Sequence, residues 1–179
     1  MVIWITGLSG AGKTTLARVL ANRLREQKHT VVVLDGDELR EVFGATAESS
    51  QNHGRDGRLR LAFQYAHLCR VIARQGVIVV ISTISLFKEI HTWNRVNLPG
   101  YFEVFLDVPM EELRRRDSKR IYHRFDVGEL KNVAGMDLVI DVPEAPDYWV
   151  DFSHSHNLQE VASVLMNKIE LKGGLINEN

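Results

Sequence analysis

Residues 2–15 read VIWITGLSGAGKTT. The first five of them are apolar or β-branched, which indicates a buried strand, and residues 7–14 form a glycine-rich loop that ends in Lys13 and Thr14. A helical pattern follows, with an apolar face made of Leu16, Val19, Leu20 and Leu24. A strand that enters such a loop and then a helix directs backbone N–H groups and the positive helix end at one point. The stretch therefore predicts a polyphosphate site that binds ATP or GTP.

The polar groups of this loop have expected roles. Lys13 would reach the β- and γ-phosphates of the nucleotide, and the Thr14 hydroxyl would be a ligand of Mg²⁺. The nucleotide-binding residues that we predict in the loop are Gly7, Ser9, Gly10, Ala11, Gly12, Lys13, Thr14 and Thr15.

The overall composition narrows the class of protein. The chain has 179 residues, of which 45% are hydrophobic and 25% charged, so we expect one domain over 1–179. Its net charge of -1 gives no general attraction to nucleic acid or to an anionic membrane, and we predict neither as a partner. The apolar run 77–81 is too short to span a bilayer, and a strand that begins at residue 2 leaves no room for a cleaved signal. Together with a single cysteine, Cys69, on an apolar and therefore buried helical face, these features predict a cytoplasmic protein.

Short β-rich runs alternate with helical stretches along the chain. The expected strands lie at 2–6, 30–34, 77–82, 101–107 and 147–152. The expected helices lie at 13–28, 37–43, 57–75, 87–96, 109–117 and 157–171. Nearly continuous apolar strands joined by helices are typical of a parallel sheet covered on both faces, so we predict a three-layer α/β/α sandwich. Its ligands should bind at the carboxyl ends of the strands.

Two segments do not follow this alternation, one at about 44–57 and one at about 114–136. Irregular segments of this length are typical of lids and binding loops. The second begins with the basic run 114–120, which contains no aromatic residue, and this favours a phosphate-clamping lid over a nucleic-acid surface. We therefore predict a loop for the acceptor substrate in the first segment and a lid in the second.

Two carboxylates, Asp35 and Asp37, directly follow the second expected strand and are separated by Gly36. Because the carboxyl ends of parallel strands share one edge of the sheet, the pair should lie beside the glycine-rich loop. One oriented carboxylate could accept the proton of an attacking hydroxyl while Lys13, Mg²⁺ and arginines neutralise the phosphates. The combination predicts a phosphoryl-transfer site.

Further motifs follow along the chain. They are Leu34-Asp35-Gly36-Asp37 with Arg40, Ile84-Ser85, and residues 101–109 (YFEVFLDVP), 116–119 (RDSK), 128–131 (GELK), 135–137 (GMD) and 144–146 (EAP). With these motifs and the glycine-rich loop, residues 1–152 resemble the adenylylsulfate (APS) kinases, which transfer phosphate from ATP to the ribose 3′-hydroxyl of adenosine 5′-phosphosulfate. The resemblance implies a P-loop nucleotide-kinase fold and an ATP-dependent phosphotransferase with an alcohol group as acceptor. ATP and Mg²⁺ are the implied cofactors, a small nucleotide is the implied acceptor, and we also expect a homodimer.

The resemblance also implies individual roles. Asp35 is the proton acceptor or a metal-orienting acid, Ser85 lies near the transferred phosphate, and Arg116 contacts the nucleotide. Thr14 and Asp35 are the implied metal-binding residues, and Lys13, Asp35 and Ser85 the catalytic ones. The implied acceptor-binding residues are Asp37, Arg40, His53, Arg58, Ile84, Lys119, Arg120, Lys131 and Val133.

The sequence departs from the APS kinase pattern where the base of the acceptor would bind. The usual phenylalanines of the acceptor loop and of the lid, which stack on adenine, are replaced by His53 and Val133, and Ala134 stands for a lid threonine. Losing an aromatic face would cost a purine roughly 1 to 3 kcal/mol per stacking contact. Leu61, Leu86 and Arg120 replace an asparagine, a proline and a glycine of the pattern.

Three functional interpretations follow. The first is an APS kinase that uses His53 as a poorer stacking plane. The second is a kinase of a cytidine diphosphate derivative such as cytidine diphosphoramidate, on which some proteins similar to APS kinases act in capsular polysaccharide synthesis. Its smaller base suits His53 and Val133 in place of the stacking rings, and its longer anionic tail suits Arg120. The third is a non-catalytic nucleotide-binding switch, against which stand the missing Asn-Lys-x-Asp pattern and the tight Asp-Gly-Asp turn.

Overall fold

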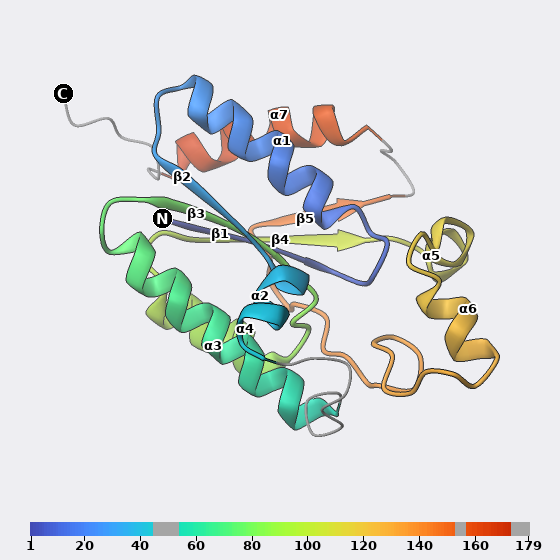
Figure 1. Cartoon of the computed structure of the whole chain (residues 1–179). Coiled ribbons are helices and arrows are strands. Elements are labelled where there is room, and N and C mark those ends of the chain that lie inside the picture. The colour runs from blue at the N-terminus through green and yellow to red at the C-terminus, as the bar shows by residue number, and fades with distance from the viewer. Residues whose placement is uncertain (45–53, 153–156, 173–179) are drawn as a thin grey trace.

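The computed structural model describes residues 1–44, 54–152 and 157–172, and its centre is a five-stranded parallel sheet (Figure 1). The strands are β1 (Val2–Gly7), β2 (Val31–Asp35), β3 (Ile78–Thr83), β4 (Tyr101–Asp107) and β5 (Tyr148–Asp151). They lie in the order β2-β3-β1-β4-β5. Because β1 pairs with β3 on one side and with β4 on the other, the glycine-rich loop begins at the middle of the carboxyl edge of the sheet.

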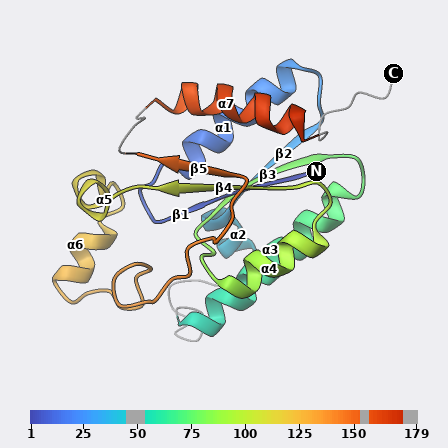
Figure 2. The ribbon, with the colours of Figure 1, turned by 180° about the vertical axis from the view of Figure 1, so that it is seen from behind.

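Helices cover both faces of the sheet (Figures 1 and 2). On one face lie α1 (Lys13–Glu26) and α7 (Leu158–Leu171), and on the other lie α2 (Gly36–Val42), α3 (Arg55–Ala73) and α4 (Lys88–Asn97). Two short helices, α5 (Met110–Arg116) and α6 (Ile121–Asp126), lie beyond the carboxyl end of β4. The predicted three-layer α/β/α sandwich is confirmed. Within the described residues, no helix is both long and apolar enough to cross a membrane.

The strands bury side chains on both faces, which explains their nearly continuous apolar sequences. In β1, Ile3 and Ile5 pack in the cluster under α1 and α7, whereas Val2 and Trp4 pack in the cluster under α3 and α4. Cys69 belongs to the second cluster, and burial raises the pKa of its thiol to about 12. The prediction of a buried, unpaired cysteine is confirmed.

The last helix begins where the sequence predicts. Asn157 caps α7, since its Oδ1 accepts the N–H of Gln159 at 3.0 Å and its side-chain amide donates to Glu160 at 3.0 Å. Val161 and Leu165 follow on the buried face and pack with the strands and α1. The apolar side of α7 therefore helps α1 to cover one face of the sheet.

The segment predicted as an irregular lid contains α6. Asp117 accepts the backbone N–H groups of Tyr122 and His123, at 3.3 and 2.9 Å, and so satisfies donors in the first turn of this helix. The Tyr122 side chain is buried, and its hydroxyl donates to the Ser9 carbonyl at 2.9 Å. The expectation of a segment without regular structure was wrong here, because a six-residue helix is too short to produce an apolar period.

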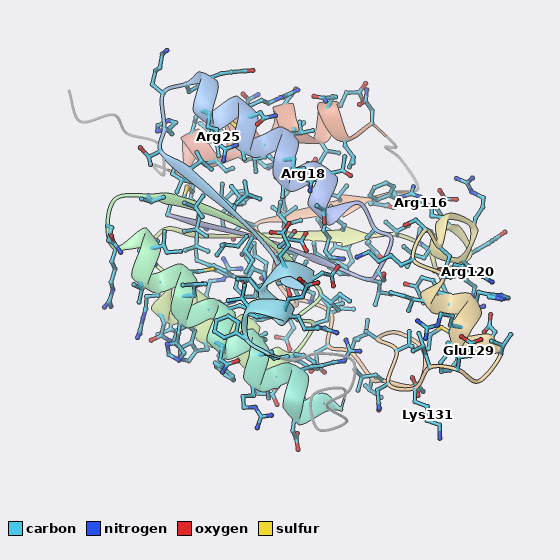
Figure 3. The ribbon with its side chains drawn as sticks, in the orientation of Figure 1. Arg18, Arg25, Arg116, Arg120, Glu129 and Lys131 are labelled. Atoms are coloured by element: carbon cyan, nitrogen blue, oxygen red, sulfur yellow. The ribbon has the colours of Figure 1, made fainter. Side chains whose placement is uncertain are left out.

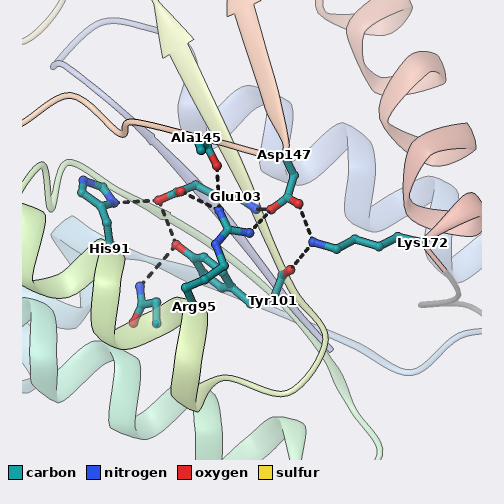
Figure 4. Close-up of polar contacts among 8 residues, drawn as sticks. His91, Arg95, Tyr101, Glu103, Ala145, Asp147 and Lys172 are labelled. Atoms are coloured by element: carbon teal, nitrogen blue, oxygen red, sulfur yellow. Dashed lines mark hydrogen bonds and ion pairs between the residues drawn. The ribbon is translucent and has the colours of Figure 1, made fainter.

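A polar network lies at the amino end of β4, at the opposite end of the sheet from the glycine-rich loop (Figure 4). Its centre is the Glu103 carboxylate, which is 2% exposed. Glu103 accepts hydrogen bonds from the Tyr101 hydroxyl at 2.9 Å and from Arg95 at 3.0 Å, and it lies 2.6 Å from His91 Nδ1. Asp147 pairs with the same arginine and accepts the Glu103 N–H at 2.8 Å. The network joins α4 to the sheet.

We expect Glu103→Gln to lower the free energy of unfolding by about 2 kcal/mol, because the amide keeps the shape but loses the charge that balances Arg95. Urea unfolding followed by circular dichroism measures the change. Glu26→Gln, on the exposed side of α1, is the matched control and should change the value by less than about 0.5 kcal/mol. Equal values for Glu103→Gln and the wild type would show that the buried charge contributes nothing.

Candidate functional site

A cavity of about 730 Å³ opens at the carboxyl edge of the sheet, between the glycine-rich loop, the start of α2, α3 and the segment after α5. Most of the site residues predicted from the sequence line this one cavity. They are Ser9, Gly10, Gly12, Lys13, Thr14, Thr15, Asp35, Asp37, Arg40, Arg58, Ile84, Ser85, Arg116, Lys119, Lys131 and Val133. Segments far apart in the chain are therefore brought together as the sequence predicts.

The glycine-rich loop forms a cradle in front of α1. Gly10 and Gly12 have φ values of 79° and 96°, in the left-handed region that favours glycine, and Gly12 is the N-cap of α1. Gly7 and Ala11, predicted to contact nucleotide, do not line the cavity. A Cβ at Gly7 would lie 2.8 Å from the Leu106 carbonyl oxygen, and Ala11 is fully buried in the core. Gly7 and Ala11 therefore pack the loop against β4 and the core, on the side away from the cavity.

Lys13 is half-buried at the start of α1, and its Nζ donates to the Leu8 carbonyl at 2.7 Å. The pKa of Lys13 is lowered to about 8, mainly by burial and also by the charge of Lys119, while Asp37 and Asp35 act in the opposite direction. An anion placed beside Lys13 would favour its charged form. A bound phosphate would therefore stabilise the charged Lys13 side chain.

Asp35 is held by three hydrogen bonds. Its Oδ2 accepts the hydroxyls of Thr14 at 2.7 Å and Ser82 at 2.8 Å, and its Oδ1 accepts the N–H of Asp37 at 2.9 Å. Burial alone would raise the pKa of Asp35, but these hydrogen bonds and the charge of Lys119 outweigh it, so the pKa lies below its ordinary value. The carboxylate is ionised at neutral pH, and it ties the end of β2 to the glycine-rich loop.

Oxygen atoms suitable for a hard cation meet at this point. Within the described residues, no group of three or more His, Cys, Asp or Glu side chains could hold a metal ion by itself. The Thr14 hydroxyl donates its proton to Asp35 and so leaves its lone pairs available. Such a sparse set of oxygen ligands fits Mg²⁺, which is usually held by few protein groups together with phosphates and water.

Two arginines, Arg40 on α2 and Arg58 on α3, also line the cavity. Burial, followed by the charge of the neighbouring Arg40, lowers the pKa of Arg58 to about 10, because two guanidinium groups repel each other in a poorly solvated place. Arg58 donates to the Asn132 carbonyl at 2.8 Å, and Tyr65 donates to the Gly36 carbonyl at 3.2 Å. The pair concentrates positive charge and favours an anionic ligand.

The segment after α5 covers the cavity from the side. Lys119 forms an ion pair with Asp37, so this segment contacts the start of α2. Val133 is buried and lines the cavity. Asp137 holds the backbone there by accepting the N–H groups of Asn132 at 2.8 Å and Val133 at 2.7 Å. The segment predicted as a lid therefore presents the aliphatic Val133 to the cavity, at the position where the APS kinase pattern has an aromatic residue.

The end of β3 supplies hydroxyl groups to the same cavity. Ser85 has a φ of 26°, outside the usual range for a residue with a side chain, and its Oγ lies 2.8 Å from Thr83 Oγ1. The fully buried Thr6, at the end of β1, donates to the Ile84 carbonyl and fixes this turn. The backbone thus holds Ser85 in an uncommon conformation at the place where the sequence predicts a catalytic role.

Four further predicted residues lie at the edge of the cavity or away from it. Arg116 lies at the end of α5, where its Nε donates to Glu112 at 2.7 Å and its guanidinium lies 5.1 Å from the Phe152 ring centre (Figure 3). Lys131 lines the cavity from the loop after α6, although its side chain is exposed. Arg120 is the exposed N-cap residue of α6 and does not line the cavity, so its contact with the acceptor stays a prediction. His53 and most of the predicted acceptor loop lie outside the described residues.

The cavity also contains residues to which the sequence interpretation gave no role in the site. They are Arg18, Gly36, Glu38, Tyr65, Ser82, Thr83, Phe87, Ser118, Ile121, Leu130, Leu138 and Ile140. Ser82 and Thr83 end an apolar strand, and two hydroxyl residues at that place were a usable signal. Arg18 and Tyr65 lie within helical patterns, where nothing in the sequence distinguishes them from ordinary surface or core residues.

Comparisons with known proteins match this chain to kinases. Residues 1–151 match the family model described as adenylylsulphate kinase. The cytidine diphosphoramidate kinase of Campylobacter jejuni is 38% identical over 170 residues, which are 95% of this chain and 96% of that protein. The probable adenylyl-sulfate kinase of Pyrococcus abyssi is 35% identical over 173 residues, which are 94% of this chain and 95% of that protein.

The fold agrees with these matches. The structure of Mycobacterium tuberculosis APS kinase CysC in complex with AMPPNP and APS superimposes with a TM-score of 0.83 at 29% identity, covering 94% of this chain and 96% of that one. The family model spans most of the chain and includes the glycine-rich loop, the Asp-Gly-Asp turn and the lid. This chain therefore belongs to the adenylylsulphate kinase family.

Proposed function

We propose that this protein is an ATP-dependent kinase that phosphorylates the ribose 3′-hydroxyl of a modified nucleotide, with adenosine 5′-phosphosulfate as the acceptor. One observation carries the proposal: Lys13, the Asp35 carboxylate hydrogen bonded to Thr14, and the arginines Arg40 and Arg58 all line one cavity. Such a cavity has one cationic side for the phosphates of ATP and another for an anionic acceptor. The related structure with AMPPNP and APS supports this choice of ligands.

The residues suggest how the transfer proceeds. Lys13 and the backbone N–H groups of the glycine-rich loop neutralise the β- and γ-phosphates. The 3′-oxygen forms a bond to the γ-phosphorus as the bond from that phosphorus to the bridging oxygen of ADP breaks, and the hydroxyl proton passes to the Asp35 carboxylate. Mg²⁺, held by Thr14 with Asp35 behind it, would neutralise charge on the phosphate oxygens. Arg40 and Arg58 would orient the acceptor through its anionic group.

A second acceptor is favoured by one specific observation, the aliphatic Val133 in the cavity. A purine loses a stacking contact there, whereas a smaller pyrimidine depends less on it. The Campylobacter jejuni relative, named cytidine diphosphoramidate kinase, supports this alternative. Cytidine diphosphoramidate is therefore our second candidate for the same reaction.

Val133→Phe separates the two acceptors. With adenosine 5′-phosphosulfate, the added ring should stack on adenine and tighten apparent binding roughly tenfold or more. With cytidine diphosphoramidate, the same ring should crowd the cavity and lower activity. The half-saturation constant for each acceptor at saturating Mg-ATP measures both effects. Val142→Phe, which adds the same ring at an exposed position outside the cavity, is the control and should change neither constant.

The test of the proposed function is ADP release from Mg-ATP with each acceptor and with no acceptor. We expect multiple turnovers with adenosine 5′-phosphosulfate or cytidine diphosphoramidate, and only slow release without either. A wild-type protein that binds ATP but releases ADP equally slowly in all three reactions would instead act as a nucleotide-binding switch.

We also propose that the protein works in the cytoplasm as a homodimer. The need for ATP and the single buried Cys69 are consistent with that compartment. Val96 on α4 and Val71 on α3 are 79% and 57% exposed, and contact with a second copy would cover such side chains. Light scattering coupled to size exclusion gives the mass in solution, and a monomer at micromolar concentration would contradict the dimer.

A further inference from the structure

Ser82 has no role in the chemistry described above, yet it is placed beside the central carboxylate. The register of the sheet pairs Ser82 of β3 with Asp35 of β2, so both side chains leave the sheet on the same face. Ser82 is 2% exposed, and its Oγ donates to Asp35 Oδ2 at 2.8 Å. A hydroxyl buried at this depth has exchanged its water contacts for a hydrogen bond to an ion.

Three donors from three elements fix the Asp35 carboxylate. Besides Ser82, the Thr14 hydroxyl donates from α1 and the Asp37 N–H donates from α2. Thr14 is expected to bind the metal as well, and the Asp37 N–H belongs to the first turn of a helix that borders the acceptor. Ser82 sits in the sheet, so its hydrogen bond does not depend on ligands or on movement of the lid.

We propose that Ser82 is a positioning residue for phosphoryl transfer, because its hydroxyl holds the Asp35 carboxylate in the orientation in which it also accepts the Thr14 proton. The inference rests on the proposed function. The charged groups that face Asp35 are Lys13 from α1 and Lys119 from the lid, and Asp37 of α2 pairs with that second lysine. Ser82 and Thr14 are the neutral side-chain donors to Asp35, and of these two only Ser82 lies in the sheet.

Removing this donor has two consequences. In Ser82→Ala, Asp35 Oδ2 keeps the Thr14 hydroxyl but loses the hydroxyl from β3, so the link between the carboxylate and the sheet is weaker. A carboxylate with one donor fewer should also turn more freely, which lowers the fraction of molecules with Asp35 correctly placed for the acceptor proton. The turnover number should fall, whereas the half-saturation constant for ATP, set by the glycine-rich loop, should change little.

The experiment combines crystallography with kinetics on the full chain. Crystal structures of the wild type, Ser82→Ala, Ser82→Thr and Ser82→Cys compare the orientation of the Asp35 carboxylate and its distance from the Thr14 hydroxyl. In the alanine variant we expect the Asp35 carboxylate to lose its single orientation beside the Thr14 hydroxyl and the turnover number to fall roughly tenfold. Ser82→Thr keeps the hydroxyl and should restore both the orientation and the turnover number. Ser82→Cys fills the space with a weak donor, should resemble the alanine variant, and replaces it if alanine prevents folding.

The outcomes separate this inference from the proposed function. An Asp35 carboxylate with the same single orientation in the wild type and in Ser82→Ala would overturn the role of Ser82, even if both proteins are active. A parallel loss of turnover in the alanine and threonine variants would also overturn it, since that would show a need for the volume of serine and not for its hydroxyl. If the wild type phosphorylates no acceptor, the proposed function fails, and the crystal structures alone still decide whether Ser82 positions Asp35.

Discussion

Lys13→Ala is expected to lower the turnover number roughly a hundredfold or more while leaving the fold intact. The Lys13 side chain lies in the cavity with its ammonium against the Leu8 carbonyl, so no core packing depends on its charge. Its removal leaves the charge that develops on the phosphates without its nearest cation. ADP release at saturating Mg-ATP and acceptor measures the loss. Lys168→Ala, on the exposed side of α7, is the control and should keep full activity.

The same lysine predicts a pH dependence. Because burial lowers the pKa of Lys13 to about 8, the free enzyme loses this charge as the pH rises through that value. The kcat/KM for ATP, which reports the free enzyme, should therefore fall above about pH 8. In Lys13→Arg the side chain stays charged, so any remaining activity should lack this decline. A decline of the same size in both proteins would assign it to another group.

Asp35→Asn is expected to produce the second large loss, again roughly a hundredfold or more in turnover number. The asparagine keeps the size of the side chain, but it can neither accept the acceptor proton nor balance the positive charges around it. Its fold should persist, because it can still cap α2 through the Asp37 N–H. Glu41→Gln, on the exposed end of α2, removes a carboxylate nearby and should have no effect.

The two variants can be distinguished further. Asp35→Asn should still bind ATP, whereas Lys13→Ala should bind it more weakly. Of these two side chains, only that of Lys13 contacts the phosphates directly in our proposal. Equilibrium binding of a fluorescent ATP analogue compares them. Near wild-type turnover in Asp35→Asn would exclude Asp35 as the proton acceptor and would leave it a structural cap of α2.

The sequence predicted the parts of the fold that repeat a simple pattern. The strand at 2–6, its loop and the helix that follows combine three independent signals, namely apolar residues, glycines and a helical period. The position of Asp35 beside this loop followed from the rule that parallel strands present their carboxyl ends together. The capped start of α7 at Asn157 was equally readable, since the Asn and Glu spacing is local.

Other features depend on tertiary contacts and could not be read from the chain. Gly7 matches the loop pattern, but its position is set by the Leu106 carbonyl behind it. Arg120 looks like a lid cation in the sequence, but it begins α6 and stays exposed. Ser82 was not named, because its importance comes from the β2–β3 register that places it against Asp35. Single-sequence patterns give residue types and order, whereas register and helix rotation decide which atoms meet.

The central claim is transfer of phosphate from ATP to a ribose 3′-hydroxyl, and identification of the product tests it most directly. The protein is incubated with Mg-ATP and adenosine 5′-phosphosulfate or cytidine diphosphoramidate, and the products are analysed by mass spectrometry and by ³¹P NMR coupling to the ribose protons. We predict an acceptor that has gained one phosphate at the 3′-position, formed in equal amount with ADP and absent with Asp35→Asn. ADP that forms without any phosphorylated nucleotide, or a phosphate attached elsewhere than the 3′-oxygen, would contradict the account.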